Sequence, residues 1–149
     1  MVIRPALALA ALLLAAPAAA AEPIEFSTTG PAVNIARTLM GQERGEPLHD
    51  DELVSVGLVD LDGDGTRDIL AFADASYFCG TAGCIPRLYL LDRDTGHWSE
   101  LPIDTGAFIN GEPSQWAVAG KNASGWTDLV FTNSDIKLVL SWNGTAYSN

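Results

Sequence analysis

Aspartates recur at close spacing in segment 60–68, which reads DLDGDGTRD. The side chains of Asp60, Asp62, Asp64 and Asp68 are all negatively charged at neutral pH. Four carboxylates this close together repel one another unless a cation lies between them. Ligands that are all oxygen select a hard cation such as calcium, and the two glycines in the segment permit the tight turn that directs several oxygens to one centre. The segment therefore predicts a calcium site.

The segment does not fit the loop of a helix–loop–helix calcium hand. That loop requires a bidentate acid at its twelfth position, where this chain has Ala71. Its eighth position is normally apolar, but here it is Arg67. The residues on both sides are rich in β-formers and lack helical periodicity. We therefore exclude a calcium hand.

A shorter loop, closed by an acid at its ninth position and joining two strands, does fit. In this arrangement Asp60, Asp62 and Asp64 donate side-chain oxygens, Thr66 donates its carbonyl oxygen, and Asp68 closes the far side. Water completes the coordination. The alternative interpretation is an acidic turn that is exposed to solvent and holds no ion.

This loop resembles the FG-GAP repeats of integrin-like and bacterial β-propellers, whose calcium loops run Asp-x-Asp-x-Asp-Gly-x-x-Asp. The match holds at every ligand position and extends over residues 59–70. The resemblance implies a bound calcium ion between two strands. The Phe-Gly and Gly-Ala-Pro elements that give the repeats their name are absent from the chain. A propeller also needs roughly four or more blades of about four strands, and this chain has strands for two.

The pattern of hydrophobic runs and turn signals predicts a mainly β fold with one short N-terminal helix. The helix is expected at 31–40, with Pro31 at its start and Gly41 as its stop, while 22–30 has an irregular pattern. Antiparallel strands then form small sheets or two propeller-blade-like units. They are expected at 53–59, 69–73, 87–91, 97–101, 115–119, 128–132 and 136–142, with a further edge strand at 146–147.

A short internal repeat relates two of these turns. Residues 65–70 match residues 125–130 at an offset of sixty. The second copy keeps the final acid as Asp128, but Asn122 stands where the first copy has Asp62. Because the second copy lacks the other carboxylates, we expect one metal site rather than two.

The beginning of the chain has the pattern of a secretory signal peptide over residues 1–21. A single positive charge at Arg4 precedes an apolar run at 6–16, which is too short to span a bilayer, and small residues follow at the expected cleavage site. We therefore expect an exported protein, periplasmic or extracellular, with 22–149 as one domain and no stable membrane insertion.

Charge and cysteine content are consistent with export. Nineteen acidic and eight basic side chains give a net charge of −11, and loss of Arg4 with the signal would make it −12. Such a surface repels nucleic acid, so we expect no nucleic-acid partner. The two cysteines, Cys79 and Cys84, are expected to form a disulfide in an oxidising compartment.

No catalytic constellation is recognisable in the chain. His49 and His97 have no serine or cysteine nucleophile in a known motif nearby. We therefore expect a non-enzymatic binding domain in which calcium is mainly structural and the partner is an unknown protein or glycan.

Two other functions fit the same residues. The first is inhibition of a basic hydrolase such as lysozyme, because the mature chain is acidic and the disulfide loop could protrude into a cleft. The second is a small carbohydrate-binding or carbohydrate-active accessory domain that uses tryptophans as a stacking surface. The tryptophans are Trp98, Trp116, Trp126 and Trp142.

Overall fold

The computed structural model describes residues 20–105 and 109–149 of the chain. The predicted signal segment 1–21, except for its last two residues, lies outside these ranges. Among the described residues, none of the helical structure is long and apolar enough to cross a membrane. The described chain consists mainly of small antiparallel sheets with one α-helix near the N-terminus, which confirms the predicted fold class.

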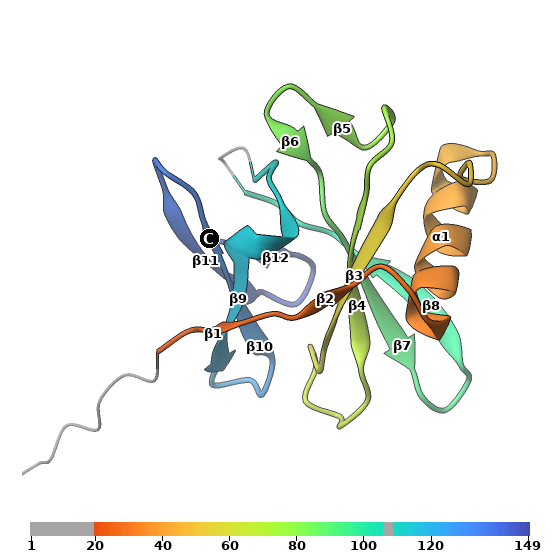
Figure 1. Ribbon diagram of the computed structural model, residues 1–149. Coiled ribbons are helices and arrows are strands. Elements are labelled where there is room, and N and C mark those ends of the chain that lie inside the picture. Colours follow the sequence, from red (N-terminus) through yellow and green to blue (C-terminus); the bar gives the residue numbers. More distant parts are fainter. Residues whose placement is uncertain (1–19, 106–108) are drawn as a thin grey trace, which may run out of the picture.

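Two five-stranded antiparallel sheets account for most of the fold (Figure 1). The first has the strand order β2-β3-β4-β7-β8, and the second has the order β1-β9-β10-β11-β12. Each therefore contains a four-stranded meander with one short strand added at its first edge. The strands are β1 Glu22–Pro23, β2 Phe26–Ser27, β3 Val54–Val59, β4 Asp68–Ala73, β5 Cys79–Gly80, β6 Gly83–Cys84, β7 Arg87–Asp92, β8 His97–Leu101, β9 Trp116–Lys121, β10 Thr127–Thr132, β11 Lys137–Trp142 and β12 Tyr147–Ser148; a short 3₁₀ helix covers Pro113–Gln115.

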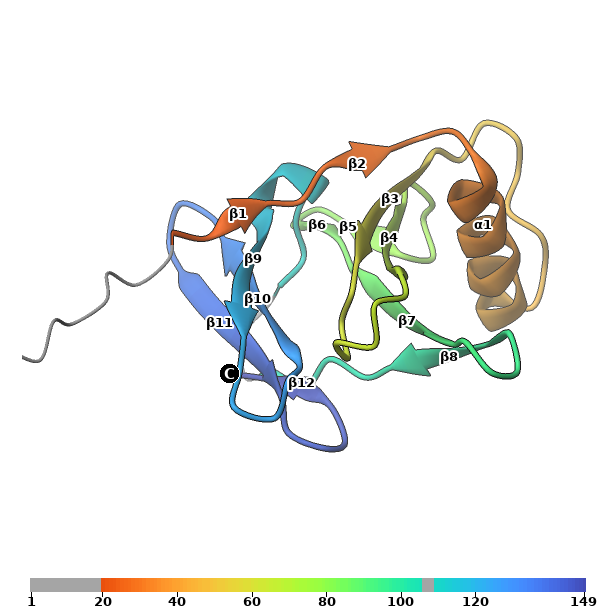
Figure 2. The same ribbon diagram turned by 90° about the horizontal axis from the view of Figure 1, so that it is seen from below.

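The N-terminal segment 22–27 contributes an edge strand to both sheets. β1 pairs with β9 through Glu22 and Val118, and β2 pairs with β3 through Phe26 and Gly57. Figure 2 shows this segment running along one edge of both sheets. The expectation of irregular structure is wrong for β1 and β2, because these strands are set by partners far along the chain and not by their own sequence.

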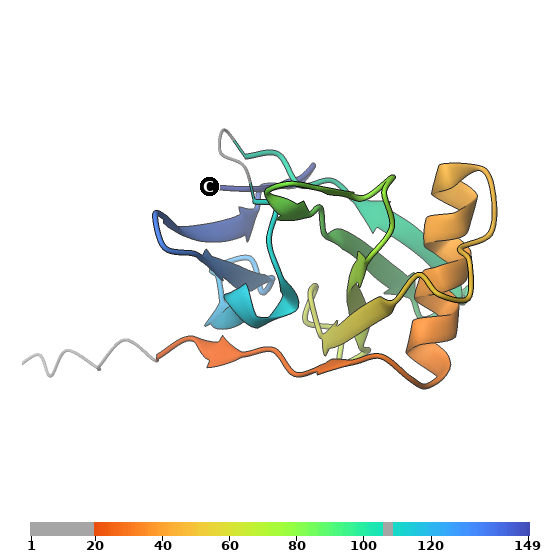
Figure 3. The ribbon, with the colours of Figure 1, turned by 45° about the horizontal axis from the view of Figure 1, so that its top comes forward.

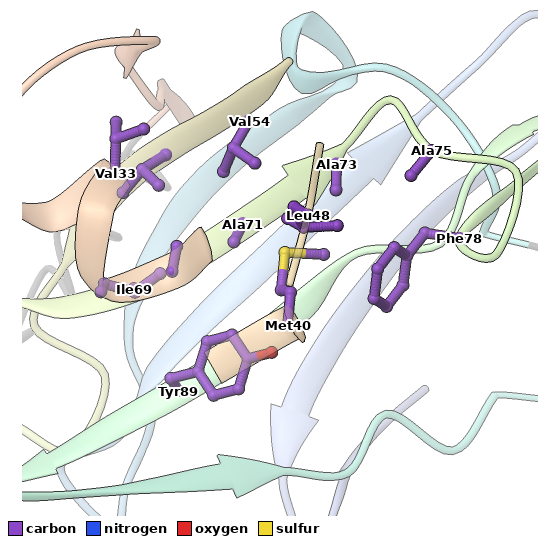
Figure 4. Packing of buried hydrophobic residues seen from close by; sticks show 12 residues of the cluster. Val33, Met40, Leu48, Val54, Ile69, Ala71, Ala73, Ala75, Phe78 and Tyr89 are labelled. Atoms are coloured by element: carbon purple, nitrogen blue, oxygen red, sulfur yellow. The ribbon is translucent and has the colours of Figure 1, made fainter. Parts of the chain in front are cut away.

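Strand β4 lies between two hydrophobic cores, and all six of its residues are buried. Its alternate side chains Ile69, Ala71 and Ala73 pack in the core beneath the helix, whereas Leu70 and Phe72 pack in the core shared with the second sheet. Figure 3 shows the helix on the side of the first sheet away from the second, and Figure 4 shows the core between helix and sheet. Burial on both faces explains the continuous apolar run of β4.

Helix α1 spans Pro31–Arg44 and therefore continues past the stop predicted at Gly41. Gly41 is buried, and a Cβ on it would lie 3.2 Å from the carbonyl oxygen of Glu46 and 3.3 Å from Cα of Pro47. The absence of a side chain at Gly41 therefore lets residues 46–47 pack closely against the helix. The helix ends at Gly45, which has a φ of 87° and donates its N–H to the carbonyl of Gly41.

Cys79 and Cys84 form the predicted disulfide, with their Cα atoms 3.9 Å apart. The residues between them form a small hairpin of β5 and β6. Cys84 also exchanges two backbone hydrogen bonds with Gly111, of 3.2 and 3.1 Å, so the hairpin is attached to the segment before the second sheet. The disulfide-closed hairpin therefore contacts a part of the chain that is distant in sequence.

Substitution of Gly57 tests the role of the N-terminal segment. A Cβ at Gly57 would overlap Cγ2 of Ile24 and lie 3.1 Å from the ring of Phe26. We expect Gly57→Ala to lower the free energy of unfolding by roughly 1–3 kcal/mol, measured by urea denaturation. Gly80→Ala is the matched control, because a Cβ at Gly80 meets no atom within 4 Å. Equal stability of the two variants would contradict this role.

Removal of the disulfide tests its contribution to stability. For so short a ring, we expect Cys79→Ser with Cys84→Ser to lower the free energy of unfolding by at most about 2 kcal/mol. Dithiothreitol is expected to lower the melting temperature of the wild type and to leave that of the double variant unchanged. A wild-type melting temperature that ignores dithiothreitol would count against a structural role.

Candidate metal centre

The aspartate loop connects β3 to β4 within the first sheet. The last residue pair between β3 and β4 is Val59 and Asp68, so the residues that flank the loop lie opposite each other on the two strands. Gly63 and Gly65 have φ values of 81° and 87°. Residues with a Cβ atom disfavour this left-handed conformation. The glycines therefore allow the turn that the sequence predicts.

Backbone N–H groups of the loop orient its carboxylates. Asp60 Oδ1 accepts from Gly63 at 2.8 Å, and Asp60 Oδ2 accepts from Gly65 at 3.2 Å. Asp62 Oδ1 accepts from the N–H of Asp64 at 3.1 Å. Asp64 Oδ1 accepts from the N–H of Thr66 at 2.6 Å, which holds the pKa of Asp64 below its usual value. These bonds wrap the backbone around the carboxylates.

Asp68 is the buried member of the loop, with 1% of its surface exposed. Its Oδ2 accepts from the N–H of Leu61 at 2.8 Å, and its Oδ1 accepts from the N–H of Leu91 on β7 at 2.9 Å. Burial raises the pKa of Asp68 to about 6, although these two N–H donors favour its ionised form. The fold therefore holds the Asp68 carboxyl group in a buried site that disfavours its ionised form.

Three of the five predicted ligands come together in the structure. Asp60, Asp62 and Asp68 each offer a carboxylate oxygen, and these oxygens lie within 4.8 Å of one another. Asp64 lies in the same loop but is outside this group. Thr66 lies between Asp64 and the buried Asp68, and its role as a carbonyl ligand stays a prediction. The structure thus brings together the first, third and ninth positions of the loop.

The related loop of the second sheet packs directly against the aspartate loop. Thr127 donates its N–H to the carbonyl of Leu61 at 2.8 Å and its hydroxyl to the carbonyl of Asp60 at 2.6 Å. A Cβ on Gly63 would lie 2.7 Å from the carbonyl oxygen of Gly125. Leu61 itself is fully buried in the core between the sheets. The aspartate loop is therefore part of the junction between the two sheets.

In the second loop an amide contacts the carboxylate that ends the loop. Asn122 Nδ2 donates to Asp128 Oδ1 at 3.2 Å. At the offset of the repeat, these residues correspond to Asp62 and Asp68. An amide therefore bonds to a carboxylate in the second loop, whereas the first loop has two carboxylates at the same places. A cation could supply the attraction that the amide supplies in the second loop.

Two basic residues that the sequence pattern did not single out lie beside the aspartate loop. Lys121 Nζ is 3.7 Å from Asp60 Oδ2, and Arg93 donates to the carbonyl of Asp64 at 2.9 Å. Lys121 comes from the end of β9 and Arg93 from the turn between β7 and β8. Their closeness to the loop follows from the docking of β9 and β7, which no local motif encodes.

The histidines lie on separate elements. His49 is exposed in the segment between α1 and β3, and His97 is exposed at the start of the edge strand β8.

Comparisons with protein-family models, curated proteins and solved structures found no match to this chain. The residues of the loop and their geometry therefore carry the functional argument.

Asp68 predicts a pH dependence of stability in calcium-free buffer. Its folded pKa of about 6 lies above its unfolded value, so its protonated form stabilises the folded state below about pH 4, and this contribution is lost as the pH rises through 6. We expect the wild type to lose roughly 1–3 kcal/mol relative to Asp68→Asn between pH 4 and pH 7, measured by urea denaturation. A difference between the two proteins that does not change with pH would contradict the burial of an ionisable group at this place.

Proposed function

We propose that this chain is an exported, non-enzymatic binding domain with an FG-GAP-like loop, in which one calcium ion stabilises the junction of two sheets. The observation that carries this proposal is the convergence of Asp60, Asp62 and Asp68 within 4.8 Å. The disulfide between Cys79 and Cys84 supports the exported location, because such bonds persist in oxidising compartments.

The donor set suits calcium. Carboxylate oxygens are hard ligands, and calcium tolerates the irregular, partly hydrated geometry of a loop better than magnesium does. Asp60, Asp62 and Asp68 would hold the ion, with Asp64 and the carbonyl of Thr66 as the remaining protein ligands. The ion would offset both the mutual repulsion of the carboxylates and the cost of burying Asp68.

The place of the loop in the fold argues for a structural ion. Leu61 is anchored in the core between the sheets, and the backbone of Asp60 and Leu61 accepts hydrogen bonds from Thr127 in the second sheet. Extracellular modules bind calcium with Kd values of about 0.1–1 mM, so calcium near 1 mM would add about 0.4–1.4 kcal/mol of stability. That amount strengthens a junction without switching the whole fold.

Thermal unfolding with and without calcium tests the proposal. We expect 1 mM calcium to raise the melting temperature of chelator-treated wild type, and we expect Asp62→Ala to abolish the response. Asp50→Ala is the matched control, because it removes the same charge from an exposed position in another loop. Identical melting of the wild type in calcium and in chelator would reject the proposal.

Asp62→Asn separates loss of the ion from loss of the loop. This change gives the first loop the amide that Asn122 supplies in the second. In chelator, we expect Asp62→Asn to be at least as stable as the wild type, because one repulsive charge is gone. In calcium, its gain in stability should be smaller than that of the wild type, because a neutral amide oxygen binds calcium more weakly than a carboxylate. A gain equal to that of the wild type would contradict a ligand role for the Asp62 carboxylate.

Inhibition of a basic hydrolase stays a prediction with less support. The disulfide hairpin has the expected rigid form, but residues 79–84 contain no acidic side chain that could enter a basic cleft. An assay of lysozyme activity at micromolar concentrations of this protein tests it directly. Inhibition that weakens as salt is added would favour this function over the proposed one.

A further inference from the structure

Four steps in the chain place a glycine directly after an asparagine or an aspartate. At such a step the backbone nitrogen of the glycine can attack the side-chain carbonyl carbon that precedes it, because glycine has no side chain to block the approach. The product is a cyclic succinimide. The four steps are Asp62–Gly63, Asp64–Gly65, Asn110–Gly111 and Asn143–Gly144.

Three of the four glycine nitrogens are held by hydrogen bonds. Gly63 and Gly65 donate their N–H groups to the two carboxylate oxygens of Asp60, at 2.8 and 3.2 Å. Gly111 is buried and donates its N–H to the carbonyl of Cys84 at 3.1 Å. Each of these nitrogens must give up its bond before it can attack. The fold therefore protects these three steps.

The fourth step, Asn143–Gly144, is open to reaction. Both residues are exposed in the turn between β11 and β12. Among residues 20–105 and 109–149, the N–H of Gly144 has no hydrogen-bond partner. A Cβ at Gly144 would meet no atom within 4 Å, so the space beside this residue is free. Water and base can therefore reach its nitrogen.

Hydrogen bonds polarise the side-chain amide of Asn143. Its Oδ1 accepts from the N–H of Thr145 at 2.9 Å, from the hydroxyl of Thr145 at 2.9 Å, and from the N–H of Ala146 at 3.0 Å. These bonds turn the amide over the backbone that follows it. When a nitrogen adds to Cγ, negative charge develops on Oδ1, and these three donors stabilise it. The turn therefore activates the amide that Gly144 would attack.

We propose that Asn143 is a site of spontaneous covalent modification by deamidation. This inference goes beyond the proposed binding function and does not depend on the calcium site. The nitrogen of Gly144 forms a bond to Cγ of Asn143, the Cγ–Nδ2 bond breaks, and Nδ2 leaves as ammonia with the proton from Gly144. Water then opens the succinimide at one of its two carbonyls. The products are aspartate and isoaspartate, each with one new negative charge.

The modified turn lies next to an attachment between the two sheets. Tyr147 on β12 donates its N–H to the carbonyl of Pro102 and accepts from the N–H of Asp104, both at 2.8 Å. Asn143 Nδ2 donates to the hydroxyl of Ser148 at 3.1 Å, a bond that both products lose. Isoaspartate also lengthens the main chain by one atom in the turn. Modification therefore loosens β12 where it joins the sheets.

Peptide mapping by mass spectrometry tests the inference, with Asn110 as a control in the same molecule. After incubation of the folded protein in mildly alkaline buffer, we expect deamidation at Asn143 to be faster than at Asn110 by a factor of roughly ten, the cost of breaking the hydrogen bond of Gly111. In concentrated urea the two rates should become similar, because both steps are Asn–Gly. Asn143→Gln should abolish the signal from the turn and leave Asn110 unchanged. Circular dichroism checks that the protein stays folded during incubation.

Equal rates at Asn110 and Asn143 in the folded protein, or no deamidation at either, would overturn the inference. A rate difference of the same size in urea would also overturn it, because the difference would then come from local sequence and not from the fold. The isoaspartate form, separated by anion exchange, should melt at a lower temperature than the unmodified protein. Equal melting of the two forms would reject the effect on β12.

Discussion

The aspartate loop brings several negatively charged carboxylates close together, and the surrounding structure must offset their repulsion. Asp60, Asp62 and Asp68 converge although like charges repel, and Asp68 is buried as well. Backbone N–H groups offset part of this cost, but they neutralise no charge. Lys121 reaches Asp60 from the surface, where its attraction is weakened by water. A calcium ion is the component that would complete this arrangement.

The position of these charges matters because the loop lies where the two sheets meet. Each sheet is a meander with its own hydrogen bonds, and the core between the sheets is apolar and non-directional. Directional contacts come from the N-terminal segment 22–27, from the pairing of Cys84 with Gly111, from the backbone bonds of Tyr147 to residues 102–104, and from the bonds of Thr127 to the aspartate loop. The loop is therefore one of the directional contacts that hold one sheet on the other.

Local sequence was sufficient to predict most of the strands, the disulfide and the aspartate turn, because each has a short-range signal. It was insufficient where a distant partner decides the structure. Gly41 has the sequence signature of a helix stop, yet the helix continues to Arg44, and the missing side chain at Gly41 makes room for the returning chain at Glu46 and Pro47. The strands at 22–27 have no β pattern and exist because two sheet edges accept them.

The same limit applies to the candidate sites. The spacing of the aspartates predicted a common centre, and the structure brings three of them together. These are Asp60, Asp62 and the buried Asp68. The docking of the second loop, and the stacking of Trp126 on Trp142, depend on the packing of whole sheets. Nothing in their local sequence separates the four tryptophans, and only the fold distinguishes the buried Trp116 from the other three, which are partly buried.

Calorimetric titration of the decalcified protein with calcium chloride tests the central claim most directly. We expect one calcium ion per chain, with a Kd of about 0.1–1 mM, because within residues 20–105 and 109–149 three aspartates converge in the first loop and not in the second. The second loop should bind none, since Asn122 already bonds to Asp128. No binding, or binding of two ions per chain, would contradict the account.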